Sequence, residues 1–167
     1  PYLESGQLMS CSGMRYAREL DEVRASEDYS DLRLVNGVII KDWVRYGIHL
    51  LDAIMGAVEH QPIAVRSVQS PHDSMVIEMT NGAVVYVDAI YDGPFHFDLS
   101  FYAGDASTDV TLSDNFTAFR RTLYHFVSQV RDSQPAIPPE TTTRAVETII
   151  AGQRSKETGE RVSIAEL

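Results

Sequence analysis

Hydrophobic positions recur with two different periods along this chain, and the change of period separates helical segments from strand segments. Over residues 42–59 the apolar positions are three or four apart, which predicts a helix with one stripe facing a core. The stripe consists of Val44, Ile48, Leu51, Met55 and Val58. Asp42 precedes it and is expected to cap the helix by accepting hydrogen bonds from its first amides.

Two later segments carry the same helical period. The first predicts a helix over Asn115–Arg131 with one apolar face. That face consists of Phe116, Phe119, Leu123, Phe126, Val127 and Val130. A proline-rich bend follows, and a last helix is expected from Glu140 to about Lys156, ending near Gly159.

Between residues 63 and 113 the period is two, which predicts strands. Met75, Ile77 and Met79 alternate with more polar neighbours, and Asn81-Gly82 is a strong hairpin signal. The expected strands here are 65–69, 75–79, 83–91, 95–102 and one through Val110 and Leu112. Leu32–Ile40 adds a β-branched strand with a bulge expected at Gly37, and 162–164 a short edge strand.

The N-terminal part is expected to hold a short strand over Gln7–Ser12, a helix over Tyr16–Ala25 and a polar linker over Ser26–Asp31. Together with the later elements this indicates an α+β fold. The sheet is expected to be open and mostly antiparallel, with about six strands in largely consecutive order and helices packed on one face.

Composition narrows the class of protein. The chain has 167 residues, of which 44% are hydrophobic and 23% charged, a composition typical of one globular domain. Its formal net charge of -10 disfavours binding to nucleic acid or to anionic membranes. No apolar run is long enough to span a membrane. The single cysteine, Cys11, excludes an intrachain disulfide and favours a cytoplasmic protein.

One polar stripe is a candidate for acid–base chemistry. Arg45, His49 and Asp52 share a face of the helix predicted over 42–59, with Asp42 beside them. Asp52 could accept the ring N–H of His49, which would make His49 a general acid or base, and Arg45 could hold an anion. The alternative is a solvent-exposed helix face of paired charges. Phosphate-binding glycine loops are absent from the sequence.

A second polar pair lies on the strand that contains His96 and Asp98. These side chains could supply two metal ligands, with a third from His72, Asp88 or Asp92. The alternative is a polar sheet face that is solvated or meets a partner. His125 is expected on the outer face of its helix.

Four segments in order resemble one family. Asp42–Gly56, DWVRYGIHLLDAIMG, is similar to the helix that opens the second domain of the Gfo/Idh/MocA oxidoreductases, with Gly47, His49 and Asp52 in the family's spacing. FVSQVRDSQP resembles a later helix and loop, and Thr141–Val162 the last helix and strand. SCSGMRYARELDEV, at Ser10–Val23, resembles the last Rossmann strand and the helix after it.

The resemblance implies a domain division and a cofactor. Residues 1–30 would be the end of a Rossmann domain plus a linker, and 31–167 the C-terminal α+β domain for substrate binding and oligomerisation. The intact protein would use NAD or NADP to oxidise a sugar-like or polyol substrate. This chain alone, lacking the Gly-rich loop, is expected neither to bind the cofactor nor to turn over substrate.

The resemblance also assigns roles to residues. His49 would be the catalytic acid or base, and Arg45, Tyr46, Asp52, Asp42 and Arg15 would contact the substrate. In the family an Asp usually stands four residues before the histidine; here Arg45 stands there. A cation at that place is expected to lower the pKa of His49. The open face of the sheet would form a homo-oligomer, and a non-catalytic dimerisation module is the alternative function.

Overall fold

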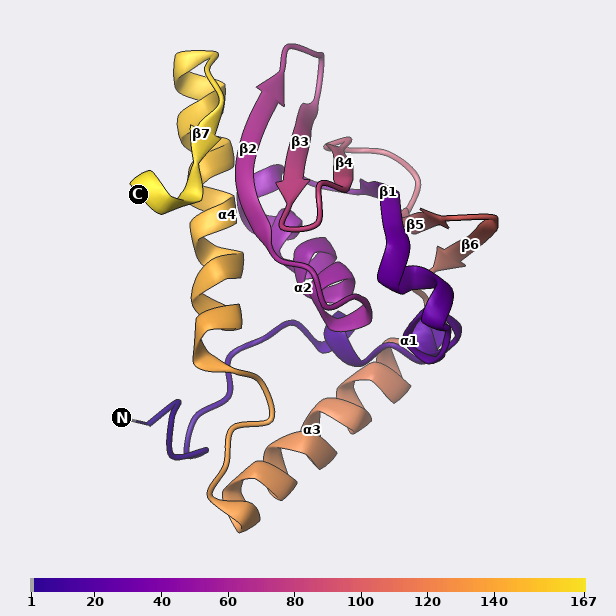
Figure 1. The fold of residues 1–167 in the computed structure, drawn as a ribbon, viewed down its shortest axis with the longest axis vertical. Coiled ribbons are helices and arrows are strands. Elements are labelled where there is room, and N and C mark those ends of the chain that lie inside the picture. Colours follow the sequence, from indigo (N-terminus) through magenta and orange to yellow (C-terminus); the bar gives the residue numbers. More distant parts are fainter. Residues whose placement is uncertain (1) are drawn as a thin grey trace.

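The computed structural model describes residues 2–167 and shows an open sheet of seven strands (Figure 1). The strands are β1 Leu32–Ile39, β2 Pro62–Val68, β3 Asp73–Met79, β4 Val84–Ala89, β5 Phe97–Ala103, β6 Ala106–Thr111 and β7 Val162–Ser163. Their order in the sheet is β6-β5-β1-β4-β3-β2-β7. The α+β class and the mostly antiparallel sheet are confirmed. However, β1 lies in the middle, antiparallel to β5 and parallel to β4, so the strand order is not consecutive.

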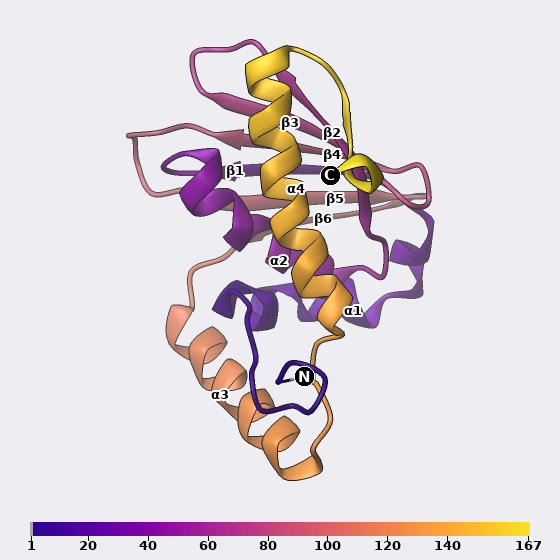
Figure 2. The same cartoon turned by 90° about the vertical axis from the view of Figure 1, so that its left-hand side faces the viewer.

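Helices cover one face of this sheet. A π-helical turn, Trp43–Gly47, leads into α2, Ile48–Ala57, and α4 runs over Pro139–Thr158. Figure 2 shows α4 across the strands, whereas α3, Asn115–Asp132, lies beyond the sheet at the end where the chain begins. Asp42 caps the π-helical turn through the amide of Arg45, and Gly159 ends α4 in a left-handed conformation, as predicted. Among residues 2–167, no helix has the length and apolar character that crossing a membrane requires.

The core lies between the sheet and α2. Alternate residues of β3 and β5 are buried, which confirms the period of two seen in the sequence. Gly37 does not form the expected bulge, because β1 is regular there and its register shifts between Leu32 and Leu34 instead. A Cβ at Gly37 would overlap Leu50 of α2, so the glycine lets the helix approach the sheet closely.

The N-terminal expectations were partly wrong. Gln7–Ser12 is not a strand, because no strand among the described residues pairs with it. Tyr16–Ala25 is not one helix: two 3₁₀ turns, Gly13–Tyr16 and Arg18–Leu20, precede the short α1, Asp21–Ala25. The expected linker is largely a 3₁₀ turn, Glu27–Asp31. Its Tyr29 is buried and donates its hydroxyl hydrogen to Thr108 Oγ1 at 2.6 Å.

The stripe predicted over 42–59 holds only in α2. Leu51, Met55 and Val58 are buried, but Val44 is exposed and Trp43 is buried in its place. The reason is the π-helical turn, whose i to i+5 hydrogen bonds change the number of residues per turn. A spacing of three or four therefore does not describe which side chains of this turn face the core.

Two further positions differ from the expectation. The strand expected from residue 95 begins at Phe97, so Phe95 precedes β5 and is exposed, and the buried aromatic residues of this strand are Phe97 and Phe101. His125 does not simply face solvent: its ring stacks on that of Tyr16 with centroids 4.3 Å apart. The N-terminal turn that contains Tyr16 packs on α3 at this point.

Candidate functional site

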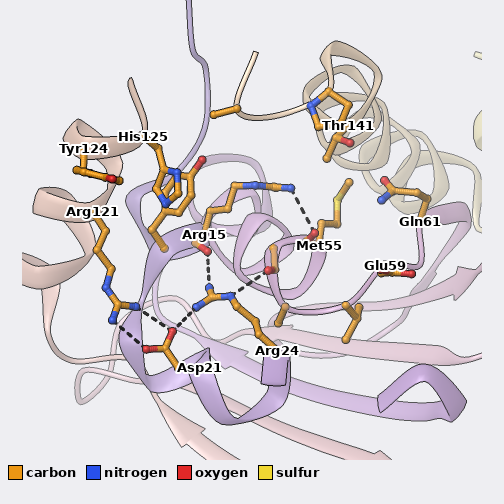
Figure 3. A pocket seen from close by; sticks show the side chains of 16 residues that line it. Arg15, Asp21, Arg24, Met55, Glu59, Gln61, Arg121, Tyr124, His125 and Thr141 are labelled. Atoms are coloured by element: carbon orange, nitrogen blue, oxygen red, sulfur yellow. Dashed lines mark hydrogen bonds and ion pairs between the residues drawn. The ribbon is translucent and has the colours of Figure 1, made fainter. Parts of the chain in front are cut away.

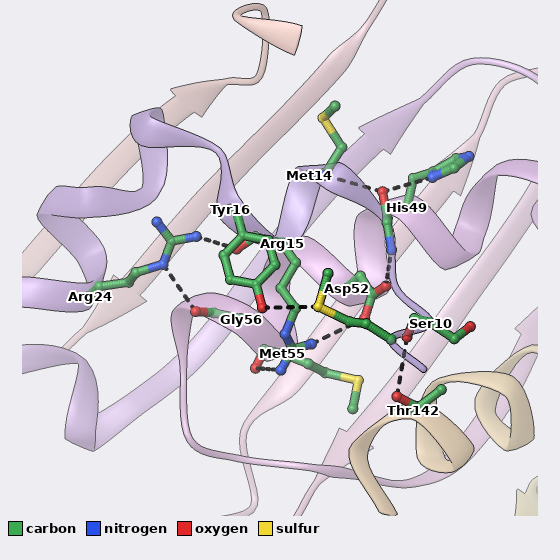
Figure 4. Close-up of polar contacts among 12 residues, drawn as sticks. Ser10, Met14, Arg15, Tyr16, Arg24, His49, Asp52, Met55, Gly56 and Thr142 are labelled. Carbon is green, nitrogen blue, oxygen red and sulfur yellow. Dashed lines mark hydrogen bonds and ion pairs between the residues drawn. The ribbon is translucent and has the colours of Figure 1, made fainter. Parts of the chain in front are cut away.

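His49 lies in the first turn of α2 and is held by the N-terminal segment (Figure 4). Its Nδ1 is 2.8 Å from Ser12 Oγ, with which it shares a hydrogen bond. Ser12 also caps the turn Gly13–Tyr16, because its Oγ accepts a hydrogen bond from the amide of Met14 at 3.2 Å. The ring of Tyr46 packs edge-on against His49 with centroids 5.3 Å apart.

Asp52, one turn further along α2, is buried and fixes the same segment. Its carboxylate accepts hydrogen bonds from the amide of Ser12 and from Arg15 Nη1, the latter at 3.1 Å. Arg15 Nη2 also donates to the carbonyl of Met55 at 3.3 Å. Burial raises the pKa of Asp52, and the hydrogen bond from Ser12 and the charge of Arg15 oppose that rise. Asp52 therefore ties residues 12–15 to α2.

The tautomer of His49 is not fixed as the sequence suggested. Asp52 was expected to accept the ring N–H, but the partner of Nδ1 is Ser12 Oγ. Among the described residues Nε2 has no hydrogen-bond partner, so it is the ring nitrogen that can exchange a proton with a ligand. The sequence analysis did not select Ser12 as a site residue, because neighbouring residues reveal only that a serine can cap the turn that follows it. Its contact with His49, 37 residues away, is a tertiary one.

The pKa of His49 is lowered, but not for the expected reason. Burial lowers it, and the negative charge of Asp52 partly opposes that effect. Arg45 is not a cause of this shift: its guanidinium pairs with Asp42, and its side chain is 72% exposed. The predicted trio is therefore divided: His49 and Asp52 share the contact with Ser12, whereas Arg45 belongs with Asp42.

A cavity of about 170 Å³ opens beside His49. It is lined by Ser10, Cys11, Ser12, Ile48, His49, Asp52, Thr142, Ala145 and Val146. Pockets that enclose drug-sized ligands usually measure about 300–1,000 Å³. At about 170 Å³ this cavity is smaller than such a pocket.

A larger hollow of about 860 Å³ lies between the N-terminal turns, the end of α2 and α3 (Figure 3). Its cationic groups are already paired. Arg24 donates to the carbonyls of Gly56 and Ala17 at 3.0 and 2.9 Å, and Arg121 forms two hydrogen bonds with Asp21. These pairs join the N-terminal turns to α2 and α3 and leave no free cation among them for an anionic ligand.

The described residues do not fit a bound dinucleotide. Pyrophosphate binds at helix N-termini whose amides are free. Here the amide of Arg45 is bonded to Asp42, the start of α3 is capped by Asp114, and α4 begins with Pro139. At these three helix starts, negative caps and a missing amide hydrogen disfavour a bound phosphate.

The expected metal pairs are separate. His96 Nδ1 bonds Asp98 and His72 Nε2 bonds Asp88, each at 2.8 Å. Asp88 and Asp98 lie opposite Val38 on its two sides, so two strand spacings of about 10 Å in total separate them. Among residues 2–167 no group of three or more His, Cys, Asp or Glu side chains could hold a metal ion.

Comparisons with known proteins show which solved structures share this fold. No family model and no curated sequence matches the chain. Among solved structures, myo-inositol 2-dehydrogenase from Lactobacillus plantarum has a TM-score of 0.77 at 14% identity, over 95% of this chain and 66% of that one. Myo-inositol dehydrogenase from Corynebacterium glutamicum has a TM-score of 0.76 at 14% identity, over 95% and 65%.

A third structure is myo-inositol dehydrogenase from Lactobacillus casei in complex with NAD(H) and myo-inositol. Its TM-score is 0.74 at 14% identity, over 93% of this chain and 63% of that chain. The chain thus spans just under two thirds of the length of these structures. The fold implied by the resemblance in the sequence is confirmed: this chain has the fold of a part of the inositol dehydrogenases, proteins of the Gfo/Idh/MocA family.

Proposed function

We propose that this chain is the substrate-binding part of an NAD(P)-dependent oxidoreductase that oxidises a hydroxyl of a polyol or sugar. The observation that carries the proposal is His49, whose Nε2 lacks a partner among the described residues and whose ring lines the cavity beside Ser12. The shared fold supports it, since the Lactobacillus casei neighbour is described as a complex with NAD(H) and myo-inositol.

Oxidation of a hydroxyl to a carbonyl removes one proton from oxygen, and His49 can take that proton. In the tautomer that acts as a base, Nδ1–H donates to Ser12 Oγ and Nε2 accepts the hydroxyl proton. The lowered pKa of His49 keeps the ring neutral and ready to accept at pH 7. In the reverse reaction the same nitrogen returns the proton.

The other predicted site residues divide into two groups. The first group makes hydrogen bonds within the protein and is assigned to positioning His49 and its helix. It consists of Asp52, Arg15 and Asp42. Tyr46 and Arg45 are assigned to substrate contact. Tyr46 touches the ring of His49, and Arg45 is exposed on the preceding turn.

NAD or NADP, the oxidant in this proposal, is assigned to a part of the polypeptide other than residues 2–167, because Asp42 and Asp114 cap the starts of the π-helical turn and of α3. Residues 1–30 are then the end of that nucleotide-binding domain and its connection, and 31–167 the C-terminal domain. The strand pattern of Gln7–Ser12 supports this division, since those residues have a strand-like sequence without a strand partner in the described chain.

The open face of the sheet is proposed as a homo-oligomer interface. Tyr86 of β4 and Tyr102 of β5 are exposed aromatic residues on strands that flank β1, and exposed apolar patches mark interaction sites. The same observation favours the second candidate function, a non-catalytic dimerisation module. The two functions differ in whether the protein performs chemistry.

The test is oxidation by the polypeptide encoded by the complete reading frame. It is incubated with NAD or NADP and a panel of polyols and sugars, and the reduced nicotinamide is followed by absorbance. The proposal expects substrate-dependent reduction with at least one polyol or sugar. If the protein forms a dimer but no polyol or sugar of the panel leads to reduction of the nicotinamide, the function is that of the dimerisation module.

A further inference from the structure

Two residues other than glycine adopt left-handed backbone angles just past the ends of the parallel strands β1 and β4. The φ angle of Lys41 is 66° and that of Tyr91 is 59°. The amide of Lys41 donates to the carbonyl of Tyr91 at 2.7 Å, and the amide of Tyr91 donates to the carbonyl of Lys41 at 2.9 Å. Lysine and tyrosine are strained at such angles, and they persist there only where surrounding contacts hold them.

The side chain of Tyr91 makes one of these contacts. Its hydroxyl donates to Asp73 Oδ1 at 2.8 Å, and Lys156 donates to the same oxygen. The other oxygen, Asp73 Oδ2, accepts from the amide of Trp43, the first residue of the π-helical turn, at 3.0 Å. Tyr91 therefore holds the start of this turn twice. Its backbone binds Lys41, two residues before the turn, and its hydroxyl binds the carboxylate that receives the first amide of the turn.

The turn held in this way carries the two residues assigned to substrate contact. Arg45 and Tyr46 lie within it, and π-helical turns are frequent at functional sites. The ring of Tyr46 packs against that of His49 with centroids 5.3 Å apart. His49 itself is held separately, through the contact of its Nδ1 with Ser12 Oγ. A change at the start of the turn would therefore displace Tyr46 while the histidine keeps its own partner.

We propose that Tyr91 is a positioning residue for substrate binding: its hydroxyl, through Asp73, keeps the π-helical turn in the arrangement that binds the substrate. The proposal rests on the function proposed above. Glycine would adopt the φ angle of Tyr91 without strain, so the strain at this position is offset by a contact that the side chain makes. The other donor to Asp73, Lys156, has a side chain that is 55% exposed and lacks the backbone bonds that fix Tyr91.

The expected effect is on affinity and not on the chemical step. Without the hydroxyl of Tyr91, the turn has the binding arrangement in only a fraction of the molecules, and the apparent dissociation constant rises by the inverse of that fraction. Once substrate is bound, the turn is in place and His49 takes the proton as before. The loss of the hydroxyl therefore raises KM and leaves kcat unchanged.

The test is Tyr91→Phe in the polypeptide of the complete reading frame, with NAD or NADP and the polyol or sugar that it oxidises fastest. This substitution retains the ring and the backbone bonds of a residue that is 38% exposed, so the fold is expected to persist. We expect KM to rise about 5-fold, the effect of one lost hydrogen bond, and kcat to change by less than about 2-fold. Tyr124→Phe is the matched control: Tyr124 is 69% exposed on α3, and both constants should stay unchanged.

A second measurement on the same proteins does not depend on turnover. Hydrogen–deuterium exchange is followed by mass spectrometry in the segment 42–47, which contains the amide bonded to Asp73. We expect this segment to exchange about 5-fold faster in Tyr91→Phe than in the unchanged protein, because the turn opens more often. In Tyr124→Phe its exchange should equal that of the unchanged protein.

Two results overturn the proposal. A lower kcat with an unchanged KM in Tyr91→Phe would show that Tyr91 contributes only to stability, because partial unfolding reduces the amount of active protein without changing its affinity. Unchanged exchange in the segment 42–47 would show that the hydroxyl does not hold the turn. A complete protein that oxidises no polyol or sugar rejects the proposed function instead, and faster exchange in its Tyr91→Phe variant still shows that Tyr91 holds the turn.

Discussion

Ser12 Oγ lies 2.8 Å from His49 Nδ1, although 37 positions separate the two residues in sequence. This contact makes the N-terminal segment part of the candidate site. Asp52 strengthens the arrangement by accepting the amide hydrogen of Ser12 and a hydrogen bond from Arg15. The orientation of the histidine thus depends on residues that the resemblance assigns to the end of another domain.

Ser12→Ala removes the partner of His49 Nδ1 while keeping the backbone bond to Asp52. We expect the nitrogen-15 shifts of the His49 ring to report a changed tautomer ratio, and kcat/KM of the complete protein to fall about 5-fold, since one hydrogen bond contributes about 1 kcal/mol. Ser12→Thr retains the hydroxyl and should restore both readouts. Wild-type ring shifts in Ser12→Ala would show that the serine does not position the ring.

The acid limb of the pH profile reports the protonation of His49. Burial holds its pKa below 6.5, so the pH at which kcat/KM is half its plateau should lie below 6.5. Asp52→Asn removes a charge that raises this pKa and should move the limb to still lower pH. A limb above pH 6.5 contradicts the assignment.

The free energy of unfolding depends on the same group. Because the pKa of His49 is lower in the folded chain, the unfolded chain takes up the proton first as pH falls, so stability decreases as pH drops below 6.5.

Gly152 of α4 permits the contact that holds the π-helical turn. A Cβ at this position would lie 2.7 Å from Trp43 Cε2, and Trp43 Nε1 donates to the carbonyl of Ile149 at 3.0 Å. Gly152→Ala should therefore lower the free energy of unfolding by about 1–3 kcal/mol in urea denaturation. Gln153→Ala, on the exposed side of the same helix, is the control and should change it by less than about 0.5 kcal/mol.

Asp73 anchors the same turn from the sheet. Its buried carboxylate accepts hydrogen bonds from the amide of Trp43 at 3.0 Å, from the hydroxyl of Tyr91 at 2.8 Å and from Lys156. Burial raises the pKa of Asp73, but these bonds lower it more, to below 3.8. The stability that the ionised group supplies is therefore present above pH 3.8 and is lost as pH falls through the folded-state pKa.

Asp73→Asn should cost about 1–3 kcal/mol of unfolding free energy at pH 7, because a buried network loses its charged acceptor. Asp92→Asn is the matched control, since the Asp92 side chain is 96% exposed in its pair with Lys41 and should contribute almost nothing. Equal effects of the two substitutions in urea denaturation would show that Asp73 does not anchor the turn.

Periodicity predicted the regular part of the fold well. The alternation in β3 and β5 and the capping of the turn at Asp42 are local properties, and the structure confirms them. Parallel pairing of β1 with β4 is not a local property. It depends on the return of the chain to the middle of the sheet, which no spacing of residues encodes directly.

The failures also have physical causes. Strand propensity in Gln7–Ser12 needs a neighbouring strand to become a strand, and none is present among the described residues. A π-helical turn replaced the first turn of the predicted helix, so Val44 and Trp43 exchanged environments. The resemblance selected His49 as a candidate, but the partner of its ring, Ser12, is brought to it only by tertiary packing.

The central claim is that His49 transfers the substrate proton. The measurement is kcat of His49→Ala in the complete protein with the polyol or sugar that it oxidises fastest. The control is His60→Ala, because His60 is a half-buried histidine bonded only to the carbonyl of Ser30 among the described residues. We predict a loss of about 10²–10⁴-fold for His49→Ala and none for His60→Ala. Turnover by His49→Ala at the rate of the unchanged protein would contradict the account.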